Sequence, residues 1–165
     1  MAKAFLFIFL GILPSYLLSE NLEGGFGTIA NDRNEPISFS SDSLFFNEQT
    51  GTSEMKGSVN ISQGYTSLSS DYAEISFNVN TNELERFSAS GEVVLKSGND
   101  IAMGDEAVYD FKKNELTFFG NVYFSQAGST LKAEKAVINT ETGSASMMGS
   151  VKTMLMPPRQ EGNGG

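Results

Sequence analysis

Four copies of a Gly-x-Val motif recur along this sequence and constrain its fold more than any other feature. They are Gly57-Ser58-Val59, Gly91-Glu92-Val93, Gly120-Asn121-Val122 and Gly149-Ser150-Val151, and their glycines are 34, 29 and 29 residues apart. An acidic residue precedes each glycine by 15 residues, or by 20 in the second copy; these residues are Asp42, Asp71, Asp105 and Glu134. Self-similarity at a period of about 20–50 residues indicates a stack of one supersecondary unit.

Within each unit, apolar and polar residues alternate, which is typical of β-strands with one buried face. In the third copy, Ala107, Tyr109 and Phe111 share a face, and Lys112-Lys113-Asn114 follows as a turn. Alternate residues from Leu116 to Phe124 then share the next face. Each unit therefore predicts two strands joined by a turn, and the chain as a whole predicts an all-β fold.

The alternation slips by one residue at the acids. Ile37 and Phe39 lie on one face before Asp42, but Leu44 and Phe46 continue out of phase. Such a slip would turn the apolar side outward unless the strand bends or bulges. We expect each acid to lie at a bulge and to accept backbone N–H bonds there. The Gly-x-Val glycines fall on the inward face by phase, where they would permit a bend or close backbone approach.

The first residues have the layout of a secretory signal peptide. Lys3 precedes an apolar run from Ala4 to Leu13, and Pro14, Ser15 and Ser19 then supply small or helix-breaking residues before the first acid, Glu20. We expect cleavage after Ser19, so that residues 1–19 are removed. The alternative is an uncleaved membrane anchor, although residues 4–18 contain Pro14 and are shorter than the roughly 20 apolar residues that a span needs.

Charge and composition exclude several classes of function. Removal of residues 1–19 leaves 10 Lys+Arg against 20 Asp+Glu, a net charge of −10. An acidic chain repels the phosphate backbone, so we expect no nucleic-acid partner. The sequence has no Cys and no His, so a disulfide scaffold, a zinc site or a Ser-His-Asp triad cannot be built. We expect no catalytic residues, no cofactor, no metal and no enzymatic activity.

Two clusters carry a resemblance to a known family. The first joins Pro36-Ile37-Ser38-Phe39-Ser40-Ser41-Asp42 with the segment from Gly57 to Gly64, and the second runs from Gly120 to Gln126 and on through residues 130–136. They resemble the OstA-like family, whose members read Pro-Ile-x-Ile-x-Ala-Asp, Gly-Asn-Val and apolar-x-Ala-Asp/Glu. The similarity covers residues 34–155, and Ser41 and Gly104 depart from the usual Ala.

The resemblance implies a twisted, partly open antiparallel β-jellyroll (a β-taco) in which two antiparallel sheets form a V. The domain would span residues 20–156, and residues 157–165 would form a disordered tail. Within the family, this chain is most similar to the soluble periplasmic members, the LptA type. These carry lipopolysaccharide by its lipid A and stack head to tail. The stack links an LptC-like inner-membrane protein to an LptD-like outer-membrane protein, and a cytoplasmic ATPase supplies the energy.

Apolar residues of the inward phase are the candidate lining of a lipid-binding groove. They are Ile37, Phe39, Leu44, Phe46, Val59, Ile61, Leu68, Ile75, Phe77, Phe87, Val93, Leu95, Tyr109, Phe111, Phe118, Val122, Phe124, Leu131, Ile138, Met147 and Val151. Periodicity alone cannot separate a groove from an ordinary dry sandwich core and, without the family, favours the core. If the sheet stays open, its edges fall near residues 36–39 and 151–155, where partners could add by strand augmentation.

Three other functions remain open on the sequence. The chain could be an LptC-like component of the same pathway, held at the inner membrane by residues 4–18. It could be a ligand-free structural β-solenoid with a filled core. A polysaccharide-processing β-helix enzyme is a third possibility, which the absence of His and Trp disfavours.

Overall fold

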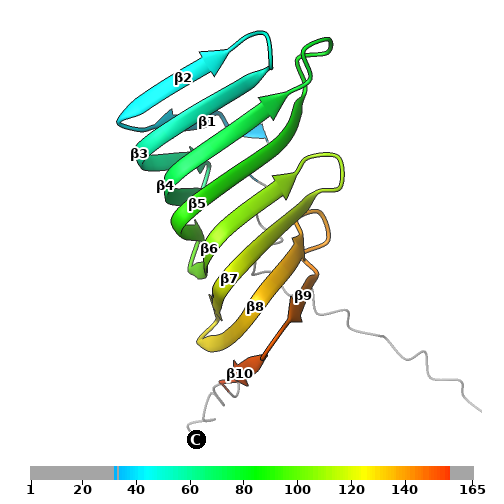
Figure 1. The fold of residues 1–165 in the computed structure, drawn as a ribbon. Coiled ribbons are helices and arrows are strands. Elements are labelled where there is room, and N and C mark those ends of the chain that lie inside the picture. Colours follow the sequence, from blue (N-terminus) through cyan, green and yellow to red (C-terminus); the bar gives the residue numbers. More distant parts are fainter. Residues whose placement is uncertain (1–31, 33, 157–165) are drawn as a thin grey trace, which may run out of the picture.

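The computed structural model describes residue 32 and residues 34–156, and these form a single sheet of ten β-strands (Figure 1). The strands are β1 (Ile37–Ser40), β2 (Ser43–Asn47), β3 (Thr52–Gln63), β4 (Thr66–Phe77), β5 (Leu84–Ser97), β6 (Asp100–Asp110), β7 (Glu115–Gln126), β8 (Ser129–Asn139), β9 (Ala145–Met148) and β10 (Lys152–Met154). The six long strands β3 to β8 pair in chain order, and every pairing is antiparallel. The all-β, open antiparallel fold is confirmed.

Short strands form both ends of the sheet. β1 and β2 pair with β3, and β9 and β10 pair with β8. Neither pair of short strands has a neighbour on its outer side among the described residues. The two predicted edges are therefore where the sequence placed them, and each carries unpaired backbone groups.

A side-chain acceptor begins each turn on one side of the sheet. Asn47, Asn78, Asp110 and Asn139 each accept hydrogen bonds from the two backbone N–H groups that lie two and three residues further on. This Asx-turn geometry lets a short polar side chain replace a backbone acceptor. The regular recurrence of these turns is the structural form of the sequence repeat.

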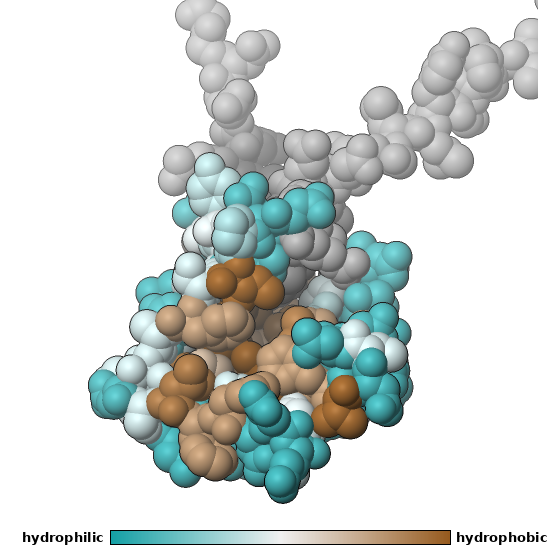
Figure 2. Space-filling model, turned by 90° about the horizontal axis from the view of Figure 1, so that it is seen from above, coloured by the Kyte–Doolittle hydropathy of each residue, from teal (hydrophilic) through white to brown (hydrophobic). Residues whose placement is uncertain are grey.

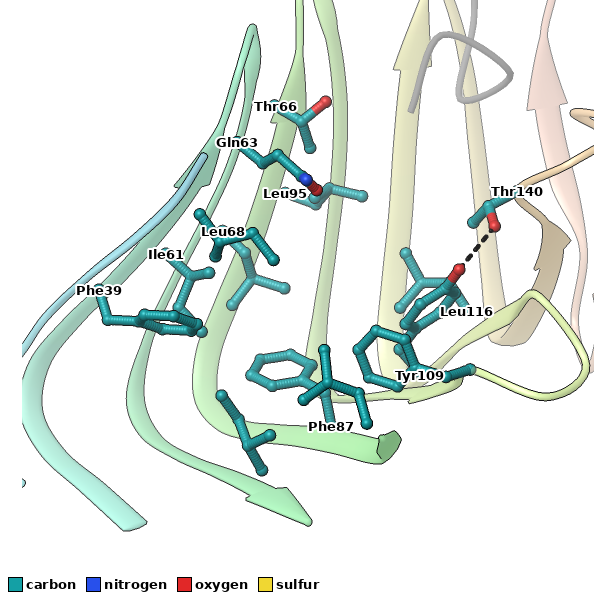
Figure 3. Close-up of a pocket in the computed structure, with 14 residues that line it drawn as sticks. Phe39, Ile61, Gln63, Thr66, Leu68, Phe87, Leu95, Tyr109, Leu116 and Thr140 are labelled. Carbon is teal, nitrogen blue, oxygen red and sulfur yellow. Dashed lines mark hydrogen bonds between the residues drawn. The ribbon is translucent and has the colours of Figure 1, made fainter. Parts of the chain in front are cut away.

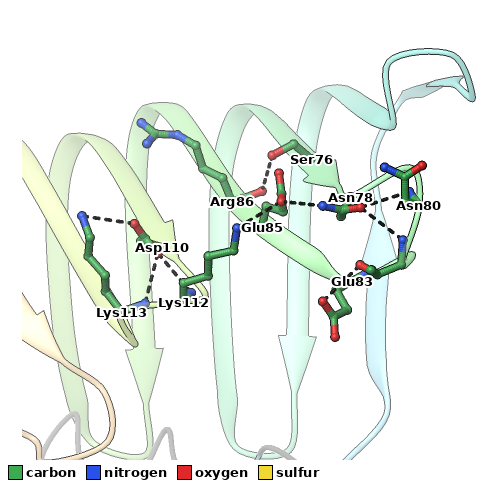
Figure 4. A network of polar contacts seen from close by, with 10 residues as sticks. Ser76, Asn78, Asn80, Glu83, Glu85, Arg86, Asp110, Lys112 and Lys113 are labelled. Atoms are coloured by element: carbon green, nitrogen blue, oxygen red, sulfur yellow. Dashed lines mark hydrogen bonds and ion pairs between the residues drawn. The ribbon is translucent and has the colours of Figure 1, made fainter.

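Polar contacts also join neighbouring turns (Figure 4). Glu85 accepts hydrogen bonds from Asn78 and from Lys112, whose Nζ lies 3.2 Å away. The Asn78 bond and then Lys112 lower the pKa of Glu85. Lys113 pairs with Asp110 at 3.4 Å. The two lysines are largely exposed and the acids partly so. Ion pairs so open to solvent contribute little to stability, and their effect is to fix the turns relative to one another.

A row of β-bulges crosses the sheet at the acids, as predicted. In the pairing of β3 with β4, Gly57-Ser58 lies opposite the single residue Asp71. Gly91-Glu92 lies opposite Asp105 in the same way, and Gly120-Asn121 lies opposite Glu134. An extra residue on one strand bends it without ending the pairing. We call this row of bulges the crease.

The crease divides the sheet into two walls that belong to one hydrogen-bonded sheet. The β1 wall holds β1, β10 and the part of each long strand on their side of the crease, and the β2 wall holds β2, β9 and the remaining parts. The two separate sheets implied by the family resemblance are therefore one continuous sheet that bends. The bulges provide the physical reason, because they redirect each strand while its neighbours follow.

Both residues of each Gly-x pair adopt left-handed backbone angles. At the third bulge, φ is +68° for Gly120 and +46° for Asn121. A Cβ on any of the four motif glycines would collide with the carboxylate of the acid 15 or 20 residues upstream. Glycine is required here because the acid occupies the space of a side chain. By phase these glycines were expected to face inward, but a side chain at these positions would point toward the acids instead.

Three of the four acids, Asp42, Asp105 and Glu134, accept a hydrogen bond from the side chain that follows the motif glycine. Asp105 accepts from the Asn121 amide at 2.9 Å and 3.2 Å, and Glu134 accepts from the Ser150 hydroxyl at 2.9 Å. At the first and last acids a backbone bond runs the other way, from Asp42 N–H to the Gly57 carbonyl at 2.8 Å and from Glu134 N–H to the Gly149 carbonyl at 3.1 Å. The predicted bulge is confirmed, but the contacts of the carboxylates differ from the backbone N–H bonds that we expected.

The signal peptide expected at residues 1–19 and the tail expected at residues 157–165 lie outside the described residues. Within the described part, no helix is long and apolar enough to cross a membrane.

Candidate lipid-binding groove

A pocket opens between the two walls toward the β1 end of the sheet (Figure 3). Its volume is about 160 Å³. The β1 wall contributes Ile37, Phe39, Ile61, Gln63, Thr66, Leu68 and Leu95. The β2 wall contributes Ile75, Leu84, Phe87, Tyr109, Phe111, Leu116 and Thr140. Most of these side chains are aliphatic or aromatic, so the pocket is suited to an apolar group.

The few polar groups of the pocket are engaged with one another or with the chain. The Tyr109 hydroxyl lies 3.0 Å from the Thr140 hydroxyl, which also donates to the Asn114 carbonyl. Thr66 donates to Asp32 at 2.7 Å, and the Gln63 amide donates to the Glu35 carbonyl at 2.9 Å. Saturated polar groups leave the apolar lining as the surface that a ligand meets.

Nothing in this pocket suits acid–base chemistry or metal binding. Of its lining residues, Tyr109 is the one with a titratable side chain, and its hydroxyl is hydrogen-bonded to Thr140. No group of three or more acidic residues in the described part is arranged to hold a metal ion. The arrangement can bind an apolar ligand by excluding water from it.

Apolar side chains are also exposed at both edges of the sheet. Figure 2, viewed from the β1 and β2 end, shows the apolar side chains of that end gathered inside a hydrophilic margin. The exposed residues of this end are Ile37, Phe39, Leu44, Phe45 and Phe46. The opposite end exposes Met148, Val151, Met154, Leu155 and Met156. Contiguous exposed apolar patches mark interaction sites.

Comparison with known proteins decides the family. Residues 39–144 match the family described as "LptA/(LptD N-terminal domain) LPS transport protein". The chain belongs to this family. Membership assigns it a role in lipopolysaccharide transport and confirms the OstA-like resemblance.

A solved structure shares the fold of this LptA-family chain. It is LptH, described as the LptA-homologous periplasmic component of the lipopolysaccharide transport device of Pseudomonas aeruginosa. The match has a TM-score of 0.68 at 19% sequence identity and covers 76% of this chain and 99% of that one. No curated protein sequence matches the chain.

The structure brings fewer than half of the predicted groove residues into the pocket of this LptA-family chain. The nine that line it are Ile37, Phe39, Ile61, Leu68, Ile75, Phe87, Leu95, Tyr109 and Phe111. Six others are buried in the core, namely Val59, Val93, Phe118, Val122, Phe124 and Ile138. Phe77, Leu131 and Met147 pack against that core and are partly buried, and Leu44, Phe46 and Val151 are exposed at the edges.

Two buried aromatic rings explain why the pocket ends where it does. Phe118 comes from the β2 wall and Phe124 from the β1 wall, and their rings meet edge to face with centroids 5.8 Å apart. Their contact joins the walls of the sheet. On the β1 wall the pocket is lined by residues of β1, β3, β4 and β5, whereas the inward residues of β7 and β8 on that wall, Val122, Phe124 and Ala133, are buried in the core.

Five lining residues were missed by the sequence reasoning. Leu84 escaped because a second irregularity between β4 and β5 shifts the register at Glu85, so that Leu84 and Phe87 share a face although they are three residues apart. Gln63 and Thr66 have the right phase but were passed over as polar. Leu116 was placed on the inward face but left out of the groove set. Thr140 had no sequence signal, because it lies just beyond the end of β8.

Proposed function

We propose that this chain carries lipopolysaccharide through the periplasm and holds lipid A acyl chains between the walls of its creased sheet. The supporting observation is the apolar pocket between the walls, bordered by the exposed side chains of Ile37 and Phe39 at the open β1 edge. Each methylene kept from water is worth about 0.8 kcal/mol, so an unshielded lipid with tens of methylenes would cost tens of kcal/mol to move through water.

The size of the pocket sets a requirement on this carrier. A cavity of about 150 Å³ holds one benzene molecule, and the pocket here is about 160 Å³. Several acyl chains need more room than that. The proposal therefore includes separation of the two walls at their free ends, where Leu84, Tyr109 and Phe111 are only partly buried. The crease would act as the hinge, and the Phe118–Phe124 contact would keep the β8 side closed.

The rest of the proposal follows from the edges of the sheet and from the family. Residues 1–19 direct the chain to the periplasm and are removed there. The chain binds and releases its cargo without chemical change. Its β1–β2 and β9–β10 edges join those of other copies, of an LptC-like inner-membrane protein and of an LptD-like outer-membrane protein. The support for these partners is that the strands at each edge expose apolar side chains and have no outer neighbour among residues 34–156.

Photo-crosslinking from two matched phenylalanine positions tests the carrier. Phe111 lines the pocket, whereas Phe119 is 37% exposed on the outer face, beside the Lys135 ammonium. A benzophenone amino acid replaces each in turn in cells, and the protein is probed for lipopolysaccharide. We expect labelling from position 111 and little from position 119. Equal labelling at both positions, or labelling at neither, would reject the groove as the lipid site.

A further inference from the structure

One row of cross-strand neighbours crosses the outer face of the β1 wall beside the crease. Its members lie two residues before each acid and three residues after each motif glycine. The directly opposed pairs of the four units are Ser40 with Asn60, Ser69 with Val94, Met103 with Tyr123, and Lys132 with Lys152. The first three pairs are uncharged, and the last is a pair of lysines. The bend of the sheet therefore forms without charge at these positions, and the repeat does not require the lysine pair.

The two lysines repel each other and lack a counter-charge in the described part of the chain. Directly opposed residues have Cβ atoms about 4.5–5.5 Å apart, and like charges at that distance destabilise a sheet. The ion pairs recorded within residues 34–156 all involve other lysines. The chain as a whole has a net charge of −9. A pair of opposed cations without an acid partner is therefore an exception on this surface.

The lysine pair borders a hollow on the outer face, which we call the outer hollow. It lies between β7, β8 and β10, and its volume is about 390 Å³. The polar residues that line it are Asn121, Tyr123, Lys132, Glu134, Ser150 and Lys152. A cavity of about 150 Å³ holds one benzene molecule. The outer hollow therefore has room for a small charged group and for part of the molecule that carries it.

Three of these side chains are left to bind a ligand. The Asn121 amide and the Ser150 hydroxyl both donate to acids of the crease, and the bond from Ser150 occupies the one carboxylate of the hollow. Within the described residues, no hydrogen bond or ion pair is recorded for the side chains of Tyr123, Lys132 and Lys152. The outer hollow therefore offers two ammonium groups and one phenolic hydroxyl.

We infer that the outer hollow binds the phosphate group of a phosphate monoester. At pH 7 such a group carries a charge of about −1.5 to −2 and three acceptor oxygens, which matches two ammonium groups and one hydroxyl. Between Lys132 and Lys152 it replaces their repulsion with charge-assisted hydrogen bonds. The Debye length at physiological ionic strength is about 8 Å, so the more distant acids of the chain are largely screened from the bound group.

This site is separate from the proposed lipid-binding groove. Tyr123 and Lys132 lie on the outer face, because their chain neighbours Val122, Phe124 and Ala133 are buried in the core between the walls. The phosphate group can belong to a soluble ester or to the headgroup of a membrane lipid. Both present the same chemistry to the outer hollow, and the experiment separates them.

Titration calorimetry of the purified chain with glycerol phosphate, at constant ionic strength, tests the soluble ester. Lys132→Gln and Lys152→Gln each remove one charge of the outer hollow. Lys96→Gln is the matched control, because Lys96 is exposed on the outer face of β5 and no ion pair of it is recorded in the described residues. We expect the unchanged chain and Lys96→Gln to bind alike, and either variant of the hollow to bind at least about tenfold more weakly through loss of one charge-assisted hydrogen bond.

Cosedimentation with vesicles tests the lipid headgroup. The vesicles consist of phosphatidylcholine alone or of equal parts of phosphatidylcholine and phosphatidic acid, a lipid whose headgroup is a phosphate monoester. If a lipid is the source, the chain sediments with the second kind and not with the first. The double variant Lys132→Gln/Lys152→Gln then stays in solution, whereas Lys96→Gln sediments like the unchanged chain.

The two measurements together decide the inference. Binding that depends on Lys132 and Lys152 but not on Lys96, in either measurement, supports the phosphate site and identifies its source. Absence of such binding from both measurements would overturn it, as would an equal loss in Lys96→Gln. Melting temperatures in phosphate-free solution show that each variant is folded, so that weak binding cannot be ascribed to unfolding. Neither result depends on photo-labelling from position 111, which reports the space between the walls.

Discussion

The carboxylate of Asp105 fills the space beside Gly120 on the neighbouring strand and accepts both recorded hydrogen bonds from the amide of the next residue, Asn121. The same acid-to-glycine contact occurs four times along the crease. The glycine gives the acid room, and the acid fixes the bulge that bends the sheet. The shape of the groove therefore depends on a polar row on the exposed side of the sheet.

Alanine at Gly120 should destabilise the fold more than alanine at a glycine with open surroundings. Both Gly120 and Gly98 have positive φ, but a Cβ at Gly98 would meet nothing within 4 Å. We expect Gly98→Ala to lower the free energy of unfolding by about 1–2 kcal/mol through backbone strain alone. Gly120→Ala should cost at least about 1 kcal/mol more, because Asp105 must move. Urea denaturation measures both, and equal losses would contradict the role of the acid.

The pairing of this acid with its glycine can be isolated by a double-mutant cycle. Asp105→Ala alone should destabilise the crease, because the Asn121 amide loses its acceptor. In the double variant with Gly120→Ala, the added Cβ no longer meets a carboxylate. The two single variants together should therefore lose more free energy of unfolding than the double variant loses, by about 0.5 kcal/mol or more. Strict additivity would show that the contact carries no energy.

Two neighbouring phenylalanines should differ sharply in their effect on stability. Phe118 is fully buried, whereas Phe119 is 37% exposed on the outer face. We expect Phe118→Ala to cost about 3–5 kcal/mol through the cavity that it leaves. Phe119→Ala should cost about 1 kcal/mol or less, the scale of its contact with Lys135. Thermal unfolding measures both variants, and similar losses of stability would contradict the assignment of the two faces of β7.

Asp100 should make the protein less stable as pH rises. Burial raises its pKa above the ordinary 3.8, so the folded state holds this proton more tightly than the unfolded state. Stability due to this group is greatest below pH 3.8 and declines as pH rises through the folded pKa. Asp100→Asn should therefore stabilise the protein at pH 7 and give no gain at strongly acidic pH. The exposed Glu48→Gln is the control, and a gain that does not depend on pH would contradict this.

Loss of the Tyr109 hydroxyl should loosen one border of the groove. Its partner Thr140 is buried and keeps its bond to the Asn114 carbonyl. We expect Tyr109→Phe to lower the free energy of unfolding by about 0.5–1.5 kcal/mol. Tyr123→Phe is the matched control, because the Tyr123 side chain lies on the outer face and no hydrogen bond of its hydroxyl is recorded in the described residues. Equal effects would show that the Tyr109–Thr140 bond adds nothing.

The crease could be predicted from the sequence because the pattern that indicates a β-bulge lies within short stretches of the chain. A one-residue slip in the alternation at Asp42, together with glycines at a fixed spacing, is sufficient to predict a bulge. The turn at Lys112-Lys113-Asn114 could be placed for the same reason. The family could also be recognised, since its motifs are those of the crease. What the slip could not show is that the acid meets a glycine on another strand.

The amino-acid sequence by itself therefore determined the repeat, the inward set of apolar residues and where the edges of an open sheet would fall, because strand alternation and glycine spacing act between near neighbours. Only the tertiary structure decided which inward residues border open space. Phe111 and Phe118 belong to the same unit and the same inward set, yet one lines the pocket and the other is sealed against Phe124. That difference depends on where the two walls meet, and the distance between walls is a property of the whole bent sheet.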